Sequence, residues 1–175
     1  RYYNGRNGLT ILFAAGNDGP DTGTVGAPST AKNTITVGNH QNRYSGAPDS
    51  IMSGSSRGPT DDGRIKPDLM AQGSYVRSLD IQYRENSAAA TSIKSGTSMA
   101  TPVVSGIAAL VLQEAGRLNI SMSPASMKTL LIQTAQDVQG IGEATKGPDY
   151  ATGWGIVDVE AAVNLLRKGG LFQGV

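Results

Sequence analysis

Two apolar runs near the start of the chain predict strands of a buried sheet. Residues 9–15 (Leu-Thr-Ile-Leu-Phe-Ala-Ala) are almost continuously apolar, which is typical of a strand buried on both faces in a parallel sheet. Residues 34–38 alternate and are rich in β-branched side chains, which predicts a second strand. The segments 19–33 and 41–63 are rich in Gly, Pro, Ser and Thr, so we expect loops there.

The second half of the chain predicts helices. Residues 103–112 form a long run of small and apolar residues, typical of a buried helix that ends near Gly116. Pro102 is compatible only with the first turn, which places Ser98 at or just before the helix N-terminus.

Two further helices carry clear start signals. Ser123 is the expected N-cap of one helix, with Pro124 at its first position. Asp158 is the expected cap of a last helix that runs to about Lys168 and stops at the glycines 169–170. The apolar face of the first of these helices is expected to consist of Met127, Leu130, Leu131 and either Thr134 or Ala135.

Two segments have weak patterns. Residues 74–94 are polar and poorly periodic, and we expect a strand end, an irregular excursion and a short strand that leads into Ser95. Residues 136–152 are a Gly-rich loop.

Composition limits the possible functions. The formal net charge is +1, only 17% of the residues are charged, and no basic run occurs, so nucleic acid is not an expected partner. No apolar stretch spans a membrane without small polar breaks, so we expect no membrane partner. The chain contains no Cys, which excludes disulfides and thiolate metal sites, and it begins at Arg1 without a signal peptide.

Ser98 is the leading candidate for chemistry. A Ser at a helix start is usually only a cap, but Gly96 permits a sharp backbone turn just before this one. The free N–H groups and the positive end of the helix dipole would favour negative charge that develops beside its hydroxyl.

Two segments carry a family resemblance. Residues 96–102 (Gly-Thr-Ser-Met-Ala-Thr-Pro) resemble the nucleophile motif of the subtilisin-like serine proteases, in which the Ser attacks the scissile carbonyl. The esterase elbow Gly-x-Ser-x-Gly does not match, because Ala100 stands at its last position. By local sequence alone Asn17 is expected to be a turn residue, but residues 14–17 (Ala-Ala-Gly-Asn) resemble the family segment whose Asn donates a hydrogen bond to the oxyanion.

The resemblance also implies a substrate pocket. It would be lined by the small residues Ala14, Ala15 and Gly16 and by the turn that begins at Gly26, and Thr97 is assigned to the same substrate-binding group. A plain surface loop remains an equal interpretation for residues 27–28.

The implied fold is α/β, with three layers and a mostly parallel sheet that carries helices on both faces. Residues 68–71 would supply another core strand, and residues 153–158 resemble the closing element of the domain. Residues 1–175 would be the C-terminal part of one catalytic domain, because the family order is Asp, His, Ser and no suitable Asp or His precedes Asn17. His40 is the one His in the chain, but it follows Asn17 and falls in a polar segment, so we expect it to be solvated and not the catalytic base.

These inferences lead to a functional expectation. The chain would be a serine endopeptidase fragment that acts on peptides or proteins and is inactive without the Asp and His. Its first strand would expose a sheet edge that pairs with the upstream half, a second copy or another chain. The alternatives are a non-catalytic binding or assembly module with the same fold, and another type of acyl hydrolase.

Localisation and cofactors rest on the resemblance. The family implies secretion, and calcium is possible by family resemblance only. The side chains of Asp49, Asp61, Asp62 and Asp68 match no calcium-loop spacing, so no metal residue is assigned. Trp154 is expected to be a packing residue.

Overall fold

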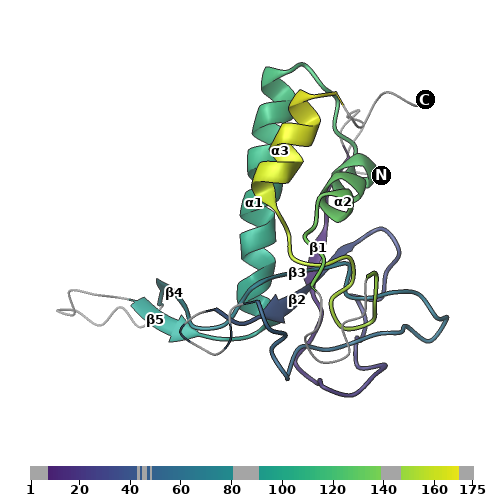
Figure 1. The fold of residues 1–175 in the computed structure, drawn as a ribbon, viewed down its shortest axis with the longest axis vertical. Helices are drawn as coiled ribbons and strands as arrows, with labels where there is room; N and C mark the ends of the chain where they lie inside the picture. The colour runs from purple at the N-terminus through teal and green to yellow at the C-terminus, as the bar shows by residue number, and fades with distance from the viewer. Residues whose placement is uncertain are drawn as a thin grey trace.

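A three-stranded parallel sheet and three helices form the body of the protein (Figure 1). The strands are β1 (Leu12–Ala14), β2 (Ile35–His40) and β3 (Leu69–Gln72), in the order β1-β2-β3. The helices are α1 (Thr97–Arg117), α2 (Pro124–Gln133) and α3 (Val159–Arg167). The computed structural model describes residues 8–42, 44, 47, 49–80, 91–138 and 147–169.

The sheet confirms the predicted strands, with one difference in the first. Every residue of β2 is buried between its two neighbours. β1 is shorter than residues 9–15 and only partly buried, and Leu9 and Ile11 are exposed. Within the described chain β1 pairs with β2 alone, so its outer side is the exposed edge that the sequence predicts.

Both predicted caps are present. The Oγ of Ser123 accepts a hydrogen bond from the Ser126 N–H at 3.0 Å, and Pro124 takes the first position of α2. The Oδ1 of Asp158 accepts from the Ala161 N–H at 2.8 Å and begins α3. The capping chemistry in the sequence therefore sets the starts of both helices.

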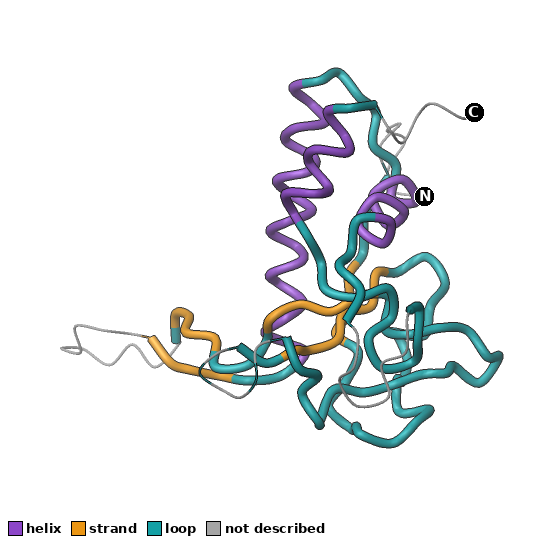
Figure 2. The backbone as a smooth tube through the Cα atoms, in the orientation of Figure 1, coloured by secondary structure: helices purple, strands orange, loops and turns teal. Residues whose placement is uncertain are grey.

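The core lies on one face of the sheet. Alternate strand residues, such as Val37 and Leu69, contact the buried stripe of α1, and α2 and α3 close the same cluster. Figures 1 and 2 show the helices on this side and long loops on the other. The α/β class with a parallel sheet is confirmed. The second helical layer has no counterpart among the residues that the structure describes, because loop segments cover that face.

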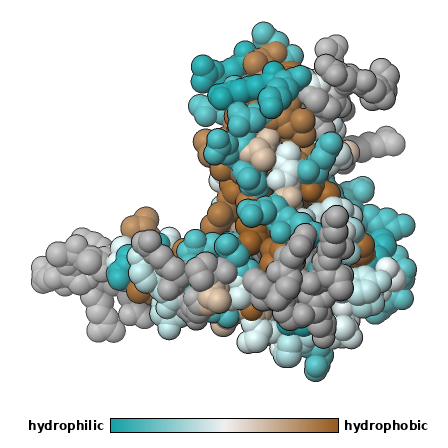
Figure 3. All heavy atoms as spheres, viewed as in Figure 1, coloured by the Kyte–Doolittle hydropathy of each residue, from teal (hydrophilic) through white to brown (hydrophobic). Residues whose placement is uncertain are grey.

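Helix α1 differs from its predicted form at its start and in its burial. It begins at Thr97, so Pro102 lies inside the helix, where its ring nitrogen cannot donate to the Ser98 carbonyl one turn back. Only one stripe of α1 is buried, whereas Val103, Leu110 and Leu112 are 38%, 53% and 43% exposed. Figure 3 shows apolar residues at the surface of the column that α1 forms with α3.

By length and composition alone, α1 is long and apolar enough to cross a membrane, a test that the core helix of a globular protein also passes. Its packing against all three strands of the sheet is instead that of a helix in a globular domain. The expectation that no apolar stretch spans a membrane without small polar breaks stays a prediction, since α1 contains such breaks at Ser105 and Gly106.

The remaining strands form a hairpin. β4 (Val76–Leu79) and β5 (Thr91–Lys94) pair antiparallel and project away from the body (Figure 2). The predicted strand before Ser95 is thus confirmed, although it pairs with its own hairpin partner and not with the main sheet. Residues 81–90, where the excursion is expected, and residues 139–146 of the predicted loop lie outside the described residues.

Candidate active site

The candidate active site lies at the carboxyl end of the sheet. β1 ends at Ala14 and is followed by Gly16 and Asn17, while β3 ends at Gln72 and is followed by Gly73, which lies beside the start of α1. The Gly96 N–H donates to the Gly73 carbonyl at 2.9 Å and fixes the helix start beside the strand end. Two segments 80 residues apart in sequence therefore meet at one place.

Asn17 is oriented by Thr97, the residue before Ser98. The Thr97 N–H donates to the Oδ1 of Asn17 at 3.0 Å, and the Thr97 hydroxyl lies 3.2 Å from the same oxygen. Because a backbone N–H can only donate, the amide oxygen of Asn17 faces Thr97 and the Nδ2 points away. No hydrogen-bond partner for this Nδ2 is present among the described residues, so its N–H groups are available.

The hydroxyl of Thr97 also fixes Gly16. It accepts from the Gly16 N–H at 3.3 Å and lies 3.2 Å from the Gly16 carbonyl oxygen. Thr97 is fully buried, so this hydroxyl has no access to water as an alternative partner. The polar contacts of the Thr97 hydroxyl therefore lie within the protein, and the assignment of Thr97 to the substrate-binding group stays a prediction.

Ser98 is the second residue of α1 and is exposed. Its hydroxyl and its N–H both lack a hydrogen-bond partner in the part of the chain that the structure describes. Met99 and Ala100 donate back to the Gly96 carbonyl at 2.9 and 3.3 Å, which closes the first turn around the Ser. The arrangement brings a free hydroxyl and a free backbone donor to the positive end of a 21-residue helix.

Gly96 is required at this turn. Its φ is +147°, and a Cβ placed there would come within 3.3 Å of the Asn17 Oδ1. A side chain at position 96 would therefore strain the backbone and press on the amide of Asn17. The sequence predicts a glycine turn at this position. The close approach to Asn17 is a second reason why a side chain is not accommodated there.

The structure adds a supporting residue that the sequence analysis did not assign. The Oγ of Ser56 accepts from the Asp18 N–H at 3.1 Å, and the Ser56 N–H donates to the Gly16 carbonyl at 3.0 Å. Ser56 is completely buried beneath the turn that carries Asn17. The sequence does not indicate which strand end Ser56 supports, because these contacts join segments that are far apart in the chain.

The predicted pocket residues lie around the end of β1. Ala15 is buried, whereas Ala14 and Gly16 are partly exposed and Gly26 is exposed. The Oγ of Ser29 donates to the Ala14 carbonyl at 2.6 Å and ties the turn at Gly26 to β1. The predicted residues are therefore held in one region by backbone and hydroxyl contacts.

A hollow on the other side of Ser98 was not predicted. It has a volume of about 310 Å³ and lies between the start of α1 and strand β4. The sequence could not indicate it, because it requires the hairpin to lie against the helix. Its lining consists of Val76, Arg77, Ser78, Ser98, Met99, Pro102 and Val103.

His40 is not the solvated loop residue that the sequence predicts. It ends β2 and is only 7% exposed, because residue 51 bridges to it on one side and Gln72 pairs with it on the other. Its Nδ1 lies 2.9 Å from the Gln41 carbonyl oxygen. Burial lowers the pKa of His40, although the Gln41 carbonyl and the Asp49 carboxylate act in the opposite direction. No contact joins its ring to Ser98.

The acidic side chains are dispersed. Asp62 pairs with Arg64 at 2.8 Å, and Asp68 is buried between two Lys side chains. Among the described residues, no three Asp, Glu or His side chains lie close enough to hold a metal ion. These carboxylates do not fit a calcium site, and we derive no step through calcium.

Comparisons with known proteins agree with this geometry. Residues 1–155 match the model of the subtilase family, peptidase S8. Serine protease AprX of Bacillus subtilis is 41% identical over 136 residues, which cover 71% of this chain and 29% of that protein. The extracellular basic protease of Dichelobacter nodosus is 30% identical over 158 residues, which cover 90% of this chain and 23% of that protein.

A solved structure shows the same fold. Sphericase superposes with a TM-score of 0.70 at 33% identity, over 85% of this chain and 47% of that one. The chain spans less than a third of the length of both curated relatives named above. From the match of the family model over most of its length, the chain belongs to the subtilase family.

Proposed function

We propose that the chain provides the nucleophile and the oxyanion donors of a serine endopeptidase. Ser98 Oγ attacks the carbonyl carbon of a peptide bond, and the carbonyl oxygen becomes an oxyanion. The Nδ2 of Asn17 and the N–H of Ser98 donate hydrogen bonds to that oxyanion. The observation that carries the proposal is the hydrogen bond from the Thr97 N–H to the Asn17 Oδ1, which turns the amide donors away from Thr97.

The attack requires a base, and the described residues offer none at Ser98. His40 is buried and bonded to the Gln41 carbonyl oxygen, so it does not take the proton of the Ser98 hydroxyl. We propose that an Asp and a His supplied by an upstream part of the catalytic domain complete the triad. Without them the chain is inactive, since loss of triad members costs about 10⁴–10⁶ in kcat, a magnitude taken from subtilisin.

The same upstream part is the proposed partner of the exposed apolar surfaces. β1 presents an unpaired edge, and α1 presents Val103 and Leu110 on its uncovered side. Pairing at β1 and burial along α1 would remove both from water. The proposed substrate is a peptide or protein, and the proposed location is outside the cell.

Labelling with a fluorophosphonate probe tests this function. The chain alone should not react, whereas the chain combined with the upstream part of its domain should be labelled at Ser98. The Ser98→Ala variant should lose the label, and Ser105→Ala, an exposed serine on the same helix, should keep it. A reconstituted, folded protein that stays unlabelled would favour a non-catalytic binding or assembly module.

A further inference from the structure

A second hollow lies at the opposite end of the sheet from Ser98. It has a volume of about 350 Å³ and is lined in part by Lys32, Lys66, Asp68, Lys128 and Trp154. Lys66 and Asp68 come just before β3, so the hollow lies at the amino ends of the parallel strands. The candidate active site lies at their carboxyl ends, and the two are therefore separate.

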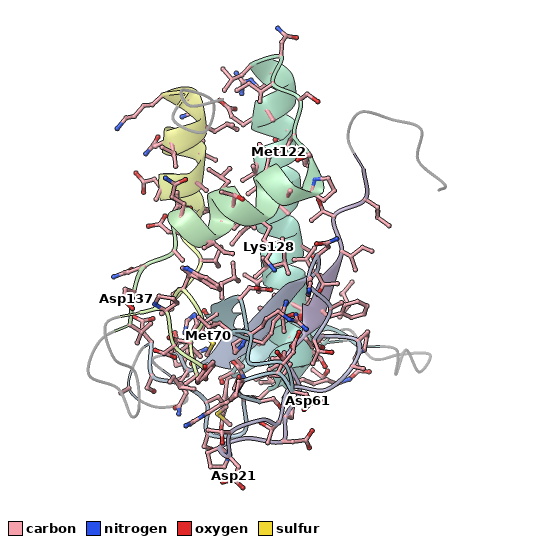
Figure 4. All side chains as sticks on the ribbon, turned by 90° about the vertical axis from the view of Figure 1, so that its right-hand side faces the viewer. Asp21, Asp61, Met70, Met122, Lys128 and Asp137 are labelled. Atoms are coloured by element: carbon pink, nitrogen blue, oxygen red, sulfur yellow. The ribbon has the colours of Figure 1, made fainter. Side chains whose placement is uncertain are left out.

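The hollow has an excess of positive charge. The carboxylate of Asp68 is shared by two cations, with Lys66 Nζ at 2.7 Å from Oδ2 and Lys128 Nζ at 2.8 Å from Oδ1. Asp68 and Lys66 are buried, so water screens this excess of positive charge weakly. Figure 4 places Lys128 on the side of α2 that faces the sheet.

Neither Lys66 nor Lys128 has a free N–H donor. Lys66 Nζ also donates to the Thr34 carbonyl and the Thr36 hydroxyl, and Lys128 Nζ donates to the Thr34 and Lys32 carbonyls. Each ammonium group thus uses its three donors. These lysines supply a fixed positive field, and an incoming anion would need a donor from another residue.

Lys32 supplies that donor. It is exposed, lines the hollow, and its ammonium group has no partner among the described residues. The indole N–H of Trp154 likewise has no partner among them. A free cation and a free indole N–H therefore border a hollow that already has a positive field.

The backbone at Trp154 is fixed against the start of β3. The Trp154 N–H donates to the Asp68 carbonyl at 3.0 Å, and the Met70 N–H donates to the Gly155 carbonyl at 2.8 Å. Gly153 and Gly155, on either side of Trp154 in the chain, have φ values of +63° and +112°. Both pack so closely against neighbouring backbone that neither position admits a Cβ. Trp154 is partly exposed and lines the hollow, so its ring offers an apolar wall to a ligand.

We propose that this hollow binds an organic carboxylate that carries an apolar group. The carboxylate would lie at Lys32 in the field of Lys66 and Lys128, and the apolar group would lie against Trp154. A neighbouring hollow of about 320 Å³ shares Lys32 and Lys128 and extends toward Pro124. The two hollows together have room for the last residues of a peptide as well as for a small free acid.

Trp154 is the only Trp in the chain and reports directly on the site. N-acetyl-leucine should change its fluorescence saturably, with a dissociation constant on the order of 1 mM for a ligand of this size. N-acetyl-leucinamide, which lacks the charge, should bind about tenfold more weakly. Acetyl-Ala-Ala-Leu with a free carboxylate distinguishes the sources, since tighter binding than N-acetyl-leucine indicates a peptide C-terminus and equal binding indicates a small acid.

A pair of charge-reversal variants provides the control. Lys32→Glu should weaken binding of N-acetyl-leucine about tenfold, whereas Lys168→Glu, on the exposed end of α3, changes the net charge equally and should leave it unchanged. Ligand-observed NMR provides a second measurement that does not depend on the tryptophan. The proposal is overturned if neither method detects binding, if the amide binds as tightly as the acid, or if both variants behave alike.

Discussion

The backbone N–H of Thr97 donates to the side-chain oxygen of Asn17 at 3.0 Å across 80 residues of sequence. This bond determines which end of the Asn17 amide faces the helix and which end faces outward. It also gives the proposed oxyanion donor a fixed direction before any substrate arrives, which is the property on which electrostatic stabilisation of a transition state depends.

Two substitutions at Asn17 separate its donor role from its structural role. Asn17→Ala should lower kcat about 10²–10³-fold in the reconstituted protease, a magnitude taken from the corresponding loss in subtilisin. Asn17→Asp keeps an oxygen for the Thr97 N–H but loses the donor, so it should be at least as inactive and remain folded. An active Asp variant would show that Asn17 only positions Thr97.

Thr97→Val should disturb the site without removing any proposed catalytic group. The buried hydroxyl of Thr97 accepts from the N–H of Gly16 and contacts the amide oxygen of Asn17. Without it the Gly16 N–H has no acceptor, which costs about 1–3 kcal/mol in the free energy of unfolding. We expect kcat to fall with little change in KM, and Thr97→Ser to restore both. Denaturant unfolding of the same variants measures the stability part, and an unchanged kcat in Thr97→Val would contradict the positioning role.

Gly73→Ala should displace the start of α1. A Cβ at this position would come within 2.5 Å of the Gly96 carbonyl oxygen and 2.8 Å of the Ala100 nitrogen, so the helix start must move. Gly106→Ala is the matched control, because no atom lies near its Cβ position and Ala is favoured over Gly in a helix by about 1 kcal/mol. Thermal unfolding should show a loss of stability for the first variant and a gain for the second.

His40 should make the stability of the fold depend on pH. Burial lowers the pKa of His40 below its usual value of 6.5, so the unfolded chain binds this proton more readily than the folded chain. The stabilisation is present above pH 6.5 and is lost as the pH falls through and below that value. The urea concentration at the midpoint of unfolding should therefore decrease as the pH is lowered to about 5, and it should decrease less in His40→Gln. If the two proteins show the same pH dependence, His40 is not its cause.

The buried carboxylate of Asp68 should be the most sensitive charge in the protein. Asp68→Asn leaves the ammonium groups of Lys66 and Lys128 without their counter-charge and should cost about 3–5 kcal/mol in the free energy of unfolding. Lys66→Met should cost less, because Lys128 and the Thr36 N–H still bond the carboxylate. Equal losses in the two variants would contradict this assignment of the network.

The sequence predicted what depends on local chemistry. Turn chemistry predicted the caps at Ser123 and Asp158, and β-branched patterning predicted a strand at residues 34–38, which the structure has at 35–40. It did not predict the burial of His40 or the hollow beside Ser98, because both depend on which distant segments pack there. The predicted start of α1 lies too late in the chain, because the prediction places Pro102 in the first turn, whereas the helix begins at Thr97.

The same distinction applies to the site. The motifs at residues 14–17 and 96–102 identified Asn17 and Ser98, but not the Thr97 contacts that orient the amide or the support from Ser56. A side chain that acts through another residue leaves no pattern of its own in a single sequence. Such contacts become visible only in three dimensions.

The distance in sequence between Asn17 and Thr97 has a consequence for folding. Closing a loop of 80 residues is entropically costly, and contacts of this span are typical of slowly formed topology. Any partly folded state in which β1 is detached from the sheet would hold the helix and its serine without the amide opposite. A nascent or damaged chain of this kind would have its nucleophile but not the oxyanion donor, and in the proposed protease the capacity to cut would arise only with the complete fold.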